Sequence, residues 1–511
     1  MRLQMEKVGP HPINNGQKWI TLAIIYVALI AFHGYRFGDE DMTETLSYAL
    51  YLKDHTLYPK DLYIQAVGPY FLNERYYFAL LLSLFSKHLD WASYFMHLVT
   101  SILLLSGLWE LSSRFLKTHI YKLLFLLATL FVSYNLNLGG NEIWYDYFVP
   151  SHLAKSLAIW GMIFWLRDRQ FQAYIIVALA TFAQPVVGAQ LALLFLIIDL
   201  YKPKSEILLT LRGPLVYVLT AGIWITAVFF SHLIGDQSIS DREFYDIMET
   251  RLAHHFFPSY YPFRAWITLT PLFIVATLVW KKYDQKLLHF FLWSFAGMIL
   301  YYLGIEVFEV PGLLSVQWFK ITVWLKPLSI LAILMVIETI VSNHATRFIG
   351  NGLLLSTLIA SIIQISGIFR LVEDKPMHFP GTNYYTADMK LALTLRDKVP
   401  SDACIILPPD VTGIRYFSRR SLYIDYKSNI HSKSYLAEAA RRRKQLYGQD
   451  LQQRQSGSDV MLESKKYYQK LQESDFEQYK IAGVDYVITT VEQKLDFEVI
   501  DSNSLFTLYK M

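Results

Sequence analysis

Long apolar runs constrain this chain more than any other feature. Segments of about 17 to 25 hydrophobic residues recur between Trp19 and Arg370, and a helix of that length crosses the hydrocarbon core of a bilayer. With 53% hydrophobic and 18% charged residues, the chain is too apolar for an ordinary soluble protein. We therefore predict a polytopic α-helical membrane protein with about eleven transmembrane helices, at residues 19–35, 91–112, 121–138, 152–166, 171–183, 186–200, 213–233, 264–280, 287–303, 321–341 and 348–369.

Two segments need separate interpretation. Residues 74–88 have an apolar core of only about ten residues, flanked by Arg75 and Lys87, which is too short to cross and indicates an interfacial helix. Gln184-Pro185 interrupts a long apolar stretch, and proline breaks a helix. The short runs on either side of it either cross fully or stay half-buried.

The distribution of lysine and arginine predicts the orientation. If the N-terminus is cytoplasmic, most basic loop residues also fall on the cytoplasmic side, as the positive-inside rule requires. Residues 36–75 hold seven acidic and four basic residues and face outward. The first apolar run has no small-residue cleavage pattern after it and should remain as an anchor. We expect a multi-pass protein of the cell (inner) membrane.

The composition becomes polar after Arg370. Residues 1–370 are predicted to form the transmembrane domain, and residues 371–511 a soluble, extracytoplasmic α/β domain large enough to have its own core. Within it we expect a helix capped by Thr386 and ending near 398, a strand at 403–407, helices at 434–447 and 467–479, and a strand at 484–490.

Charge and cysteine content exclude several classes of function. The net charge of +4 is small and the basic residues of the chain are scattered, so nucleic acid is not an expected partner. The single cysteine, Cys404, rules out an intramolecular disulfide and a cysteine-built metal site.

An acidic cluster, Asp39-Glu40-Asp41, follows the first span directly. Asp41 and Glu44 have the spacing of a capping box, which gives Asp41 a structural role. Asp39 and Glu40 have no such role, and Gly38 before them permits a sharp turn. They are either solvated acids at the lipid boundary or a catalytic site, because a general base needs a positioned carboxylate.

A second outer loop, residues 139–155, carries four candidate binding residues: Glu142, Asp146, His152 and Lys155. Two acidic loops on one face can converge on an acceptor, on a divalent cation, or on nothing. Lys155 lies just inside the membrane, where it either meets an anion or extends toward the interface.

Two later segments carry further candidates. They are the basic residues Arg251, His254, His255 and Lys320, together with the neutral Gln317. Arginine, lysine and histidine suit a lipid-linked phosphate, because they offer donors and positive charge where a leaving phosphate gains negative charge. A plain surface role is the alternative. Lys326 lies deep enough in the membrane to require a partner.

This layout resembles that of the GT-C superfamily of integral-membrane glycosyltransferases. The resemblance rests on the Gly38-Asp39-Glu40 motif after the first span, outer helices, an interfacial Glu74–Leu81 segment and a second acidic outer loop. It covers the layout of residues 19–370 and is strongest for uncharacterised bacterial members with an outer C-terminal domain.

The resemblance implies inverting transfer of a sugar from a polyprenyl-phosphate donor to a glycan, lipid or protein acceptor at the outer face, among membrane lipids. Asp39 would deprotonate the acceptor, and Glu40 would orient the acceptor or Asp39. Arg251, His254 and Lys320 would bind the phosphate, and apolar grooves between helices would hold the prenyl chain. Some relatives bind a divalent cation through equivalent acids, a role open to Glu142 or Asp146.

Two other classes of function remain open. A transporter or flippase would also have intramembrane lysines and a broken helix, although no internal repeat is visible here. A non-enzymatic envelope assembly protein would use the outer domain to grip an acidic partner, through Arg415, Arg419, Arg420 and the run from Arg441 to Lys444.

Overall fold

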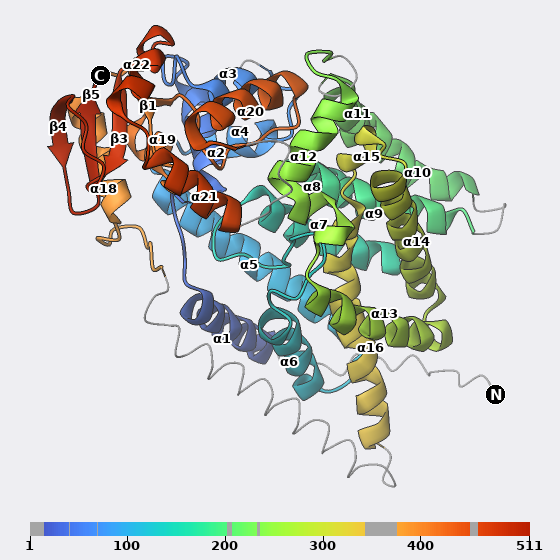
Figure 1. The fold of residues 1–511 in the computed structure, drawn as a ribbon. Coiled ribbons are helices and arrows are strands. Elements are labelled where there is room, and N and C mark those ends of the chain that lie inside the picture. Colours follow the sequence, from blue (N-terminus) through green and yellow to red (C-terminus); the bar gives the residue numbers. More distant parts are fainter. Residues whose placement is uncertain are drawn as a thin grey trace.

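The computed structural model describes residues 15–39, 41–68, 70–201, 207–231, 236–342, 376–449 and 458–511. A large helical part is joined to a smaller C-terminal domain with a mixed sheet (Figure 1). The predicted domain boundary at residue 370 and the predicted helix 348–369 lie outside the described residues.

The apolar runs form helices, as predicted. They are α1 (Asn15–His33), α5 (Leu89–Ser113), α6 (His119–Leu127), α7 (Pro150–Leu166), α8 (Gln170–Ala183), α9 (Pro185–Asp199), α10 (Ile207–Tyr217), α11 (Ile223–Phe229), α13 (Phe263–Tyr283), α14 (Gln285–Tyr302) and α16 (Thr322–Ser342). Within the described ranges, six helical stretches are long and apolar enough to cross a membrane. Large apolar side chains such as Ile24 and Leu278 stay exposed on their outer faces, which suits contact with lipid. The chain is a multi-pass membrane protein.

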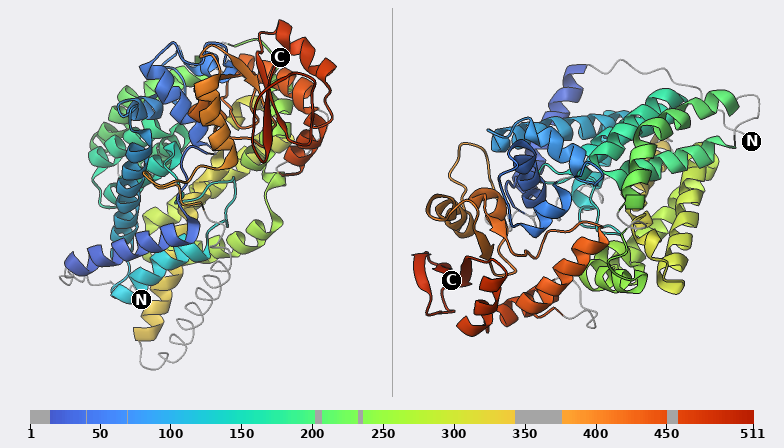
Figure 2. Two further views of the ribbon diagram at one scale, coloured as in Figure 1. Left: turned by 90° about the vertical axis from the view of Figure 1, so that its left-hand side faces the viewer. Right: turned by 90° about the horizontal axis from the view of Figure 1, so that it is seen from above.

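Shorter helices gather at one end of the bundle. They are α2 (Met42–Lys53), α3 (Leu62–Val67), α4 (Tyr76–Ser83), α12 (Asp241–Phe256) and α15 (Pro311–Leu314). Helix α4 has only eight residues, so the segment 74–88 does not span the membrane, in agreement with the prediction. The C-terminal domain lies at the same end, beside α2, α3 and α12 (Figures 1 and 2).

The C-terminal domain contains α18 (Ala387–Lys398), β1 (Cys404–Ile406), α19 (Ile414–Ser418), β2 (Ser421–Leu422), α20 (Lys433–Tyr447), α21 (Ser458–Tyr468), α22 (Glu473–Ile481), β3 (Tyr486–Thr490), β4 (Glu498–Ser502) and β5 (Phe506–Lys510). The strand order is β2-β1-β3-β5-β4, in which β2, β1 and β3 are parallel and β5 and β4 antiparallel. The sheet is therefore mixed, with a hairpin at one edge.

The helix boundaries of this domain follow local capping. Thr386 caps α18 as predicted, because its side chain accepts a hydrogen bond from the Met389 amide. The helix region predicted at 467–479 contains parts of two helices and a break between them. Helix α21 ends at Tyr468, and a capping box between Gln472 and Asp475 starts a new helix.

A buried ion-pair network fixes the C-terminal domain to the short helices at this end of the bundle. Arg415 is 2% exposed and pairs with Asp61, the N-cap of α3, at 2.8 Å and with Asp425 at 2.6 Å. Asp61 also accepts a hydrogen bond from the Leu422 amide at 2.9 Å. Because buried charges must keep their partners, this network sets where residues 409–431 lie above the membrane part.

Candidate functional site

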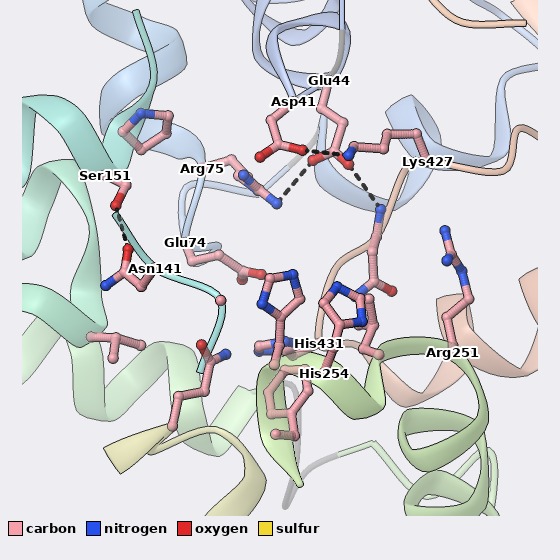
Figure 3. Close-up of a pocket in the computed structure, with 18 of the residues that line it drawn as sticks. Asp41, Glu44, Glu74, Arg75, Asn141, Ser151, Arg251, His254, Lys427 and His431 are labelled. Carbon is pink, nitrogen blue, oxygen red and sulfur yellow. Dashed lines mark hydrogen bonds and ion pairs between the residues drawn. The ribbon is translucent and has the colours of Figure 1, made fainter. Parts of the chain in front are cut away.

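A cavity of ≈ 1100 Å³ lies between the short helices, the membrane helices and the C-terminal domain (Figure 3). The charged side chains that line the cavity define its polar end. These are Asp39, Asp41, Glu44, Glu74, Arg75, Arg251, Lys320, Asp388, Asp410, Lys427 and Arg443, together with the histidines 254, 255 and 431. We call this end the polar chamber.

The other end of the cavity is an apolar groove between membrane helices. Its lining includes Val186, Ala189 and Leu193 of α9, together with Val228 and Phe229 of α11. Helix α9 begins here because Pro185 cannot continue α8, which confirms the predicted break at Gln184-Pro185. The cavity therefore joins a charged compartment to a surface of hydrocarbon side chains.

Gly38 turns the chain into the polar chamber. Its φ of +73° is the left-handed conformation that glycine adopts without strain, and a Cβ there would lie 2.5 Å from the Phe417 ring. The next residue, Asp39, lines the cavity and accepts a hydrogen bond from the Thr412 hydroxyl of the C-terminal domain. Glu40 lies outside the described residues.

Asp41 and Glu44 form ion pairs instead of the predicted capping box. Asp41 makes no side-chain cap on α2 and lies 3.1 Å from the ammonium of Lys427. Glu44 pairs with Arg75 at 2.9 Å and accepts from the Asn429 amide at 3.2 Å (Figure 3). The prediction was wrong because cations that are distant in the sequence provide stronger partners than the helix N-terminus.

Burial changes the protonation of this chamber. Loss of water around Glu44 raises the pKa of its carboxyl from 4.5 to about 7, although Arg75 opposes the change. Burial, together with the nearby Arg443, lowers the pKa of Arg251 to about 10, so Arg251 remains charged at neutral pH. Burial and the neighbouring Lys320 hold the pKa of His255 well below its usual range, and this imidazole is neutral.

Helix α12 brings three predicted residues to the cavity, Arg251, His254 and His255. The Arg251 guanidinium stacks 4.2 Å from the Tyr426 ring and donates to the Tyr426 carbonyl. The helix is distorted at Leu252, and the rings of the adjacent histidines lie 4.1 Å apart. In the described part of the chain, no group of three or more His, Cys, Asp or Glu has the geometry of a metal site.

Gln317 and Lys320 reach the cavity from a tight turn before α16. Gln317 has left-handed backbone angles, and its carbonyl accepts from the Lys320 amide at 2.9 Å. Both were predicted as substrate-binding residues, with anion binding as one candidate role.

The second acidic loop lies in the cavity wall. Glu142, Asp146, His152 and Lys155 are buried and do not belong to the cavity lining. Glu142 pairs with Lys326 at 3.1 Å, which supplies the partner predicted for that lysine.

Asp146 connects the two acidic loops. It forms a two-bond ion pair with Arg36, at 2.8 and 3.0 Å, and its carbonyl accepts from the Arg36 amide at 2.9 Å. The loops therefore meet, as predicted, but they meet through an arginine rather than around a ligand.

Lys155 does not extend toward the interface. It is fully buried and donates to the Asn141 side chain and to the Glu142 carbonyl, and its partners are neutral oxygens. His152 packs against the rings of His97 and Trp144. Asn141 itself lines the cavity, so this buried cluster supports the wall from behind.

The arginines assigned to an acidic partner in the assembly hypothesis have partners inside the domain. Arg420 donates to the carbonyls of Val399 and Arg396, and Arg443 donates to those of Asp425 and Ser428. Like Arg415, they are buried. For these three arginines the hypothesis is wrong, because their guanidinium groups are committed to the fold; Arg419, Arg441 and Lys444 are exposed, and for them it stays open.

Sequence reasoning missed Arg75, Lys427 and His431 as cavity residues. Arg75 was visible as the start of the interfacial helix, next to Glu74. Lys427 and His431 lie in a loop of the C-terminal domain without a motif, and only the fold brings them to the chamber.

No family model and no curated protein matches the sequence. Among solved structures, the chain is similar to ArnT from Cupriavidus metallidurans in the apo state, with 13% sequence identity and a TM-score of 0.48. The match covers 97% of this chain and 98% of the other. It is a likeness in chain layout alone.

Proposed function

We propose that this protein is a GT-C-type glycosyltransferase that moves a sugar from a polyprenyl-phosphate donor to an acceptor hydroxyl at the outer face of the cell membrane. The observation that carries the proposal is that one cavity joins an apolar groove to a chamber of carboxylates and cations. A lipid-linked sugar has the same division, with a hydrocarbon tail, a phosphate and a hydroxylated head. In this proposal the N-terminus is cytoplasmic and the C-terminal domain extracytoplasmic.

The donor would lie across the junction of the two ends. Its prenyl chain would occupy the groove between α9 and α11, where apolar contact favours hydrocarbon. Its phosphate would meet Lys320, Arg251 and Arg75, which supply charge and hydrogen-bond donors. These cations stabilise the leaving phosphate as the glycosidic bond breaks.

Asp39 is the proposed general base. The acceptor oxygen attacks the anomeric carbon on the face opposite the phosphate, its proton passes to the Asp39 carboxylate, and the bonding electrons of the broken C–O bond move to the phosphate oxygen. A single displacement of this kind inverts the anomeric configuration. Thr412 holds one Asp39 oxygen, and Glu40 is proposed to orient the acceptor or Asp39.

The test is transfer of radiolabelled sugar from undecaprenyl-phosphate hexoses to membrane acceptors by the full-length protein in liposomes. Asp39→Asn should lower the rate at least ~100-fold, because a general base contributes about that much or more. The control is Asp54→Asn, the same change in an exposed acid of the same outer segment that does not line the cavity. Full transfer by Asp39→Asn would refute this assignment. A transporter or flippase would move the lipid without forming a glycosidic product.

A further inference from the structure

Several residues that line the cavity have a buried side-chain polar atom without a hydrogen-bond partner. Among the described residues that line it, the side-chain carbonyls of Gln184 and Gln317 are two such atoms. Leaving a buried polar group unpaired costs about 1–3 kcal/mol. A cavity that contains unpaired acceptors is therefore suited to a ligand that donates hydrogen bonds.

The backbone holds both glutamines in place. Gln317 is 5% exposed and has φ 46° and ψ 47°, a conformation that is unfavourable for a residue other than glycine. The side chain of Gln190 stabilises this conformation by donating to the backbone carbonyls of Val316 and Gln317, at 2.9 and 3.0 Å. Gln184 connects α8 to α9 in an extended conformation, and its backbone amide donates to the Ala180 backbone carbonyl at 2.8 Å.

Both glutamines line the cavity directly beside apolar residues of its lining. Gln184 immediately precedes Pro185 and Val186 of the groove, and Gln317 follows Val316, which also lines the cavity. Gln317 shares a hydrogen-bonded turn with Lys320, one of the proposed phosphate ligands. A donor whose phosphate contacts Lys320 would place the next group, its sugar, within reach of these amides.

We propose that Gln184 and Gln317 form a sugar-recognition subsite that binds hydroxyl groups of an uncharged donor sugar. This inference rests on the proposed function and names its substrate class. A primary amide provides one acceptor and two donors, and a hydroxyl group can satisfy both kinds of site. A phosphate only accepts hydrogen bonds and leaves the amide carbonyls unpaired. A neutral amide also provides no charge to balance a sugar carboxylate.

The experiment measures binding of two phosphodiesters to the full-length protein in nanodiscs. The first probe is undecaprenyl-phosphate glucose, mannose or galactose, whichever binds most tightly. The second is the methyl ester of undecaprenyl phosphate, which has the same tail and charge but no sugar. Wild type should prefer the sugar-bearing probe. Gln317→Met and Gln184→Met should each weaken its binding about 10-fold, equal to 1.4 kcal/mol, and change binding of the methyl ester less than about 2-fold.

Gln65→Met is the matched control, because Gln65 is exposed on α3 and does not line the cavity. It should leave both affinities unchanged. Equal losses for both probes in the Gln317 and Gln184 variants would overturn the inference, because the amides would then act on the phosphate or on the fold. Unchanged binding of the sugar-bearing probe, or no preference in wild type, would also overturn it.

Failure of the proposed function gives a different result. In that case wild type binds neither lipid, or binds the sugar-bearing lipid and transfers no sugar. Deoxy analogues of the preferred sugar then identify the hydroxyl that each glutamine contacts, because the analogue lacking it should be bound equally by wild type and by the corresponding variant.

Discussion

Two groups of charged residues in this molecule differ in where their partners lie. The wall group, Glu142, Asp146, Lys155 and Lys326, is buried behind the cavity and bonded to other parts of the protein. The cavity group, Arg75, Arg251, Lys320 and Lys427, lines the open volume. In the sequence of a membrane protein, both groups are candidates for a functional site, because a charged side chain is costly inside the membrane. The comparison shows that cost alone does not identify a site; the groups must also face space for a ligand.

The largest expected effect is a loss of stability when an ion pair of the wall group is broken. Glu142→Gln leaves the Lys326 ammonium, which is 1% exposed, without its carboxylate. Removing one partner of a buried pair costs about 3–5 kcal/mol, and we expect that loss in detergent unfolding experiments. Glu477→Gln breaks an exposed pair with Lys480 and should cost less than about 1 kcal/mol. Equal losses would show that the wall group is not structural.

The next effect separates the two groups. Lys320→Gln removes a cavity cation and should lower the rate of sugar transfer about 100-fold with little change in melting temperature. Lys326→Gln should instead reduce the melting temperature. If Lys320→Gln destabilises the protein as strongly as Lys326→Gln, the distinction between wall and cavity fails.

A smaller effect depends on pH and involves Glu44, which faces Arg75, Asp41, Asp425 and Lys427. Its carboxyl has a pKa of 4.5 when unperturbed and about 7 in the folded protein. Between these values the folded state keeps a proton that the unfolded state has lost. This contribution to stability is therefore complete below about pH 4.5 and disappears as the pH rises through 7.

Glu44→Gln should remove that dependence. We expect wild type to lose on the order of 2 kcal/mol relative to the variant between pH 5 and pH 8, measured by chemical unfolding in detergent. Parallel pH curves for the two proteins would contradict the raised pKa.

The smallest effect is expected on the surface of the C-terminal domain. Arg441 pairs with Glu438 three residues earlier, and both side chains are substantially exposed. Arg441→Ala should change the unfolding free energy by less than about 0.5 kcal/mol and leave sugar transfer intact. A large loss of transfer would return the arginine run to consideration as a binding surface.

The membrane helices were predictable, because bilayer thickness fixes the length of an apolar run that crosses it. Strands β4 and β5 were not predicted. Strand β4 is mostly exposed, so its sequence has no alternation between buried and exposed positions to indicate a strand.

The ion pairs of the chamber also could not be predicted. Asp41 and Lys427 are separated by most of the chain, and an Asp-x-x-Glu pattern fits a cap as well as it fits a cavity. The opposite error concerned the second loop. In the sequence, its acids have no evident partner and so suggest a ligand site. Only the fold reveals that Arg36 pairs with Asp146 and Lys326 with Glu142.

The buried contact of Arg415 with Asp61 limits the routes by which a ligand can reach the cavity. Moving the C-terminal domain away from α3 would expose that pair, so the pair opposes opening of the chamber on this side. If the protein acts as proposed, its water-insoluble donor must therefore enter from the bilayer, along the groove lined by α9 and α11, and the carrier phosphate must leave by the same route.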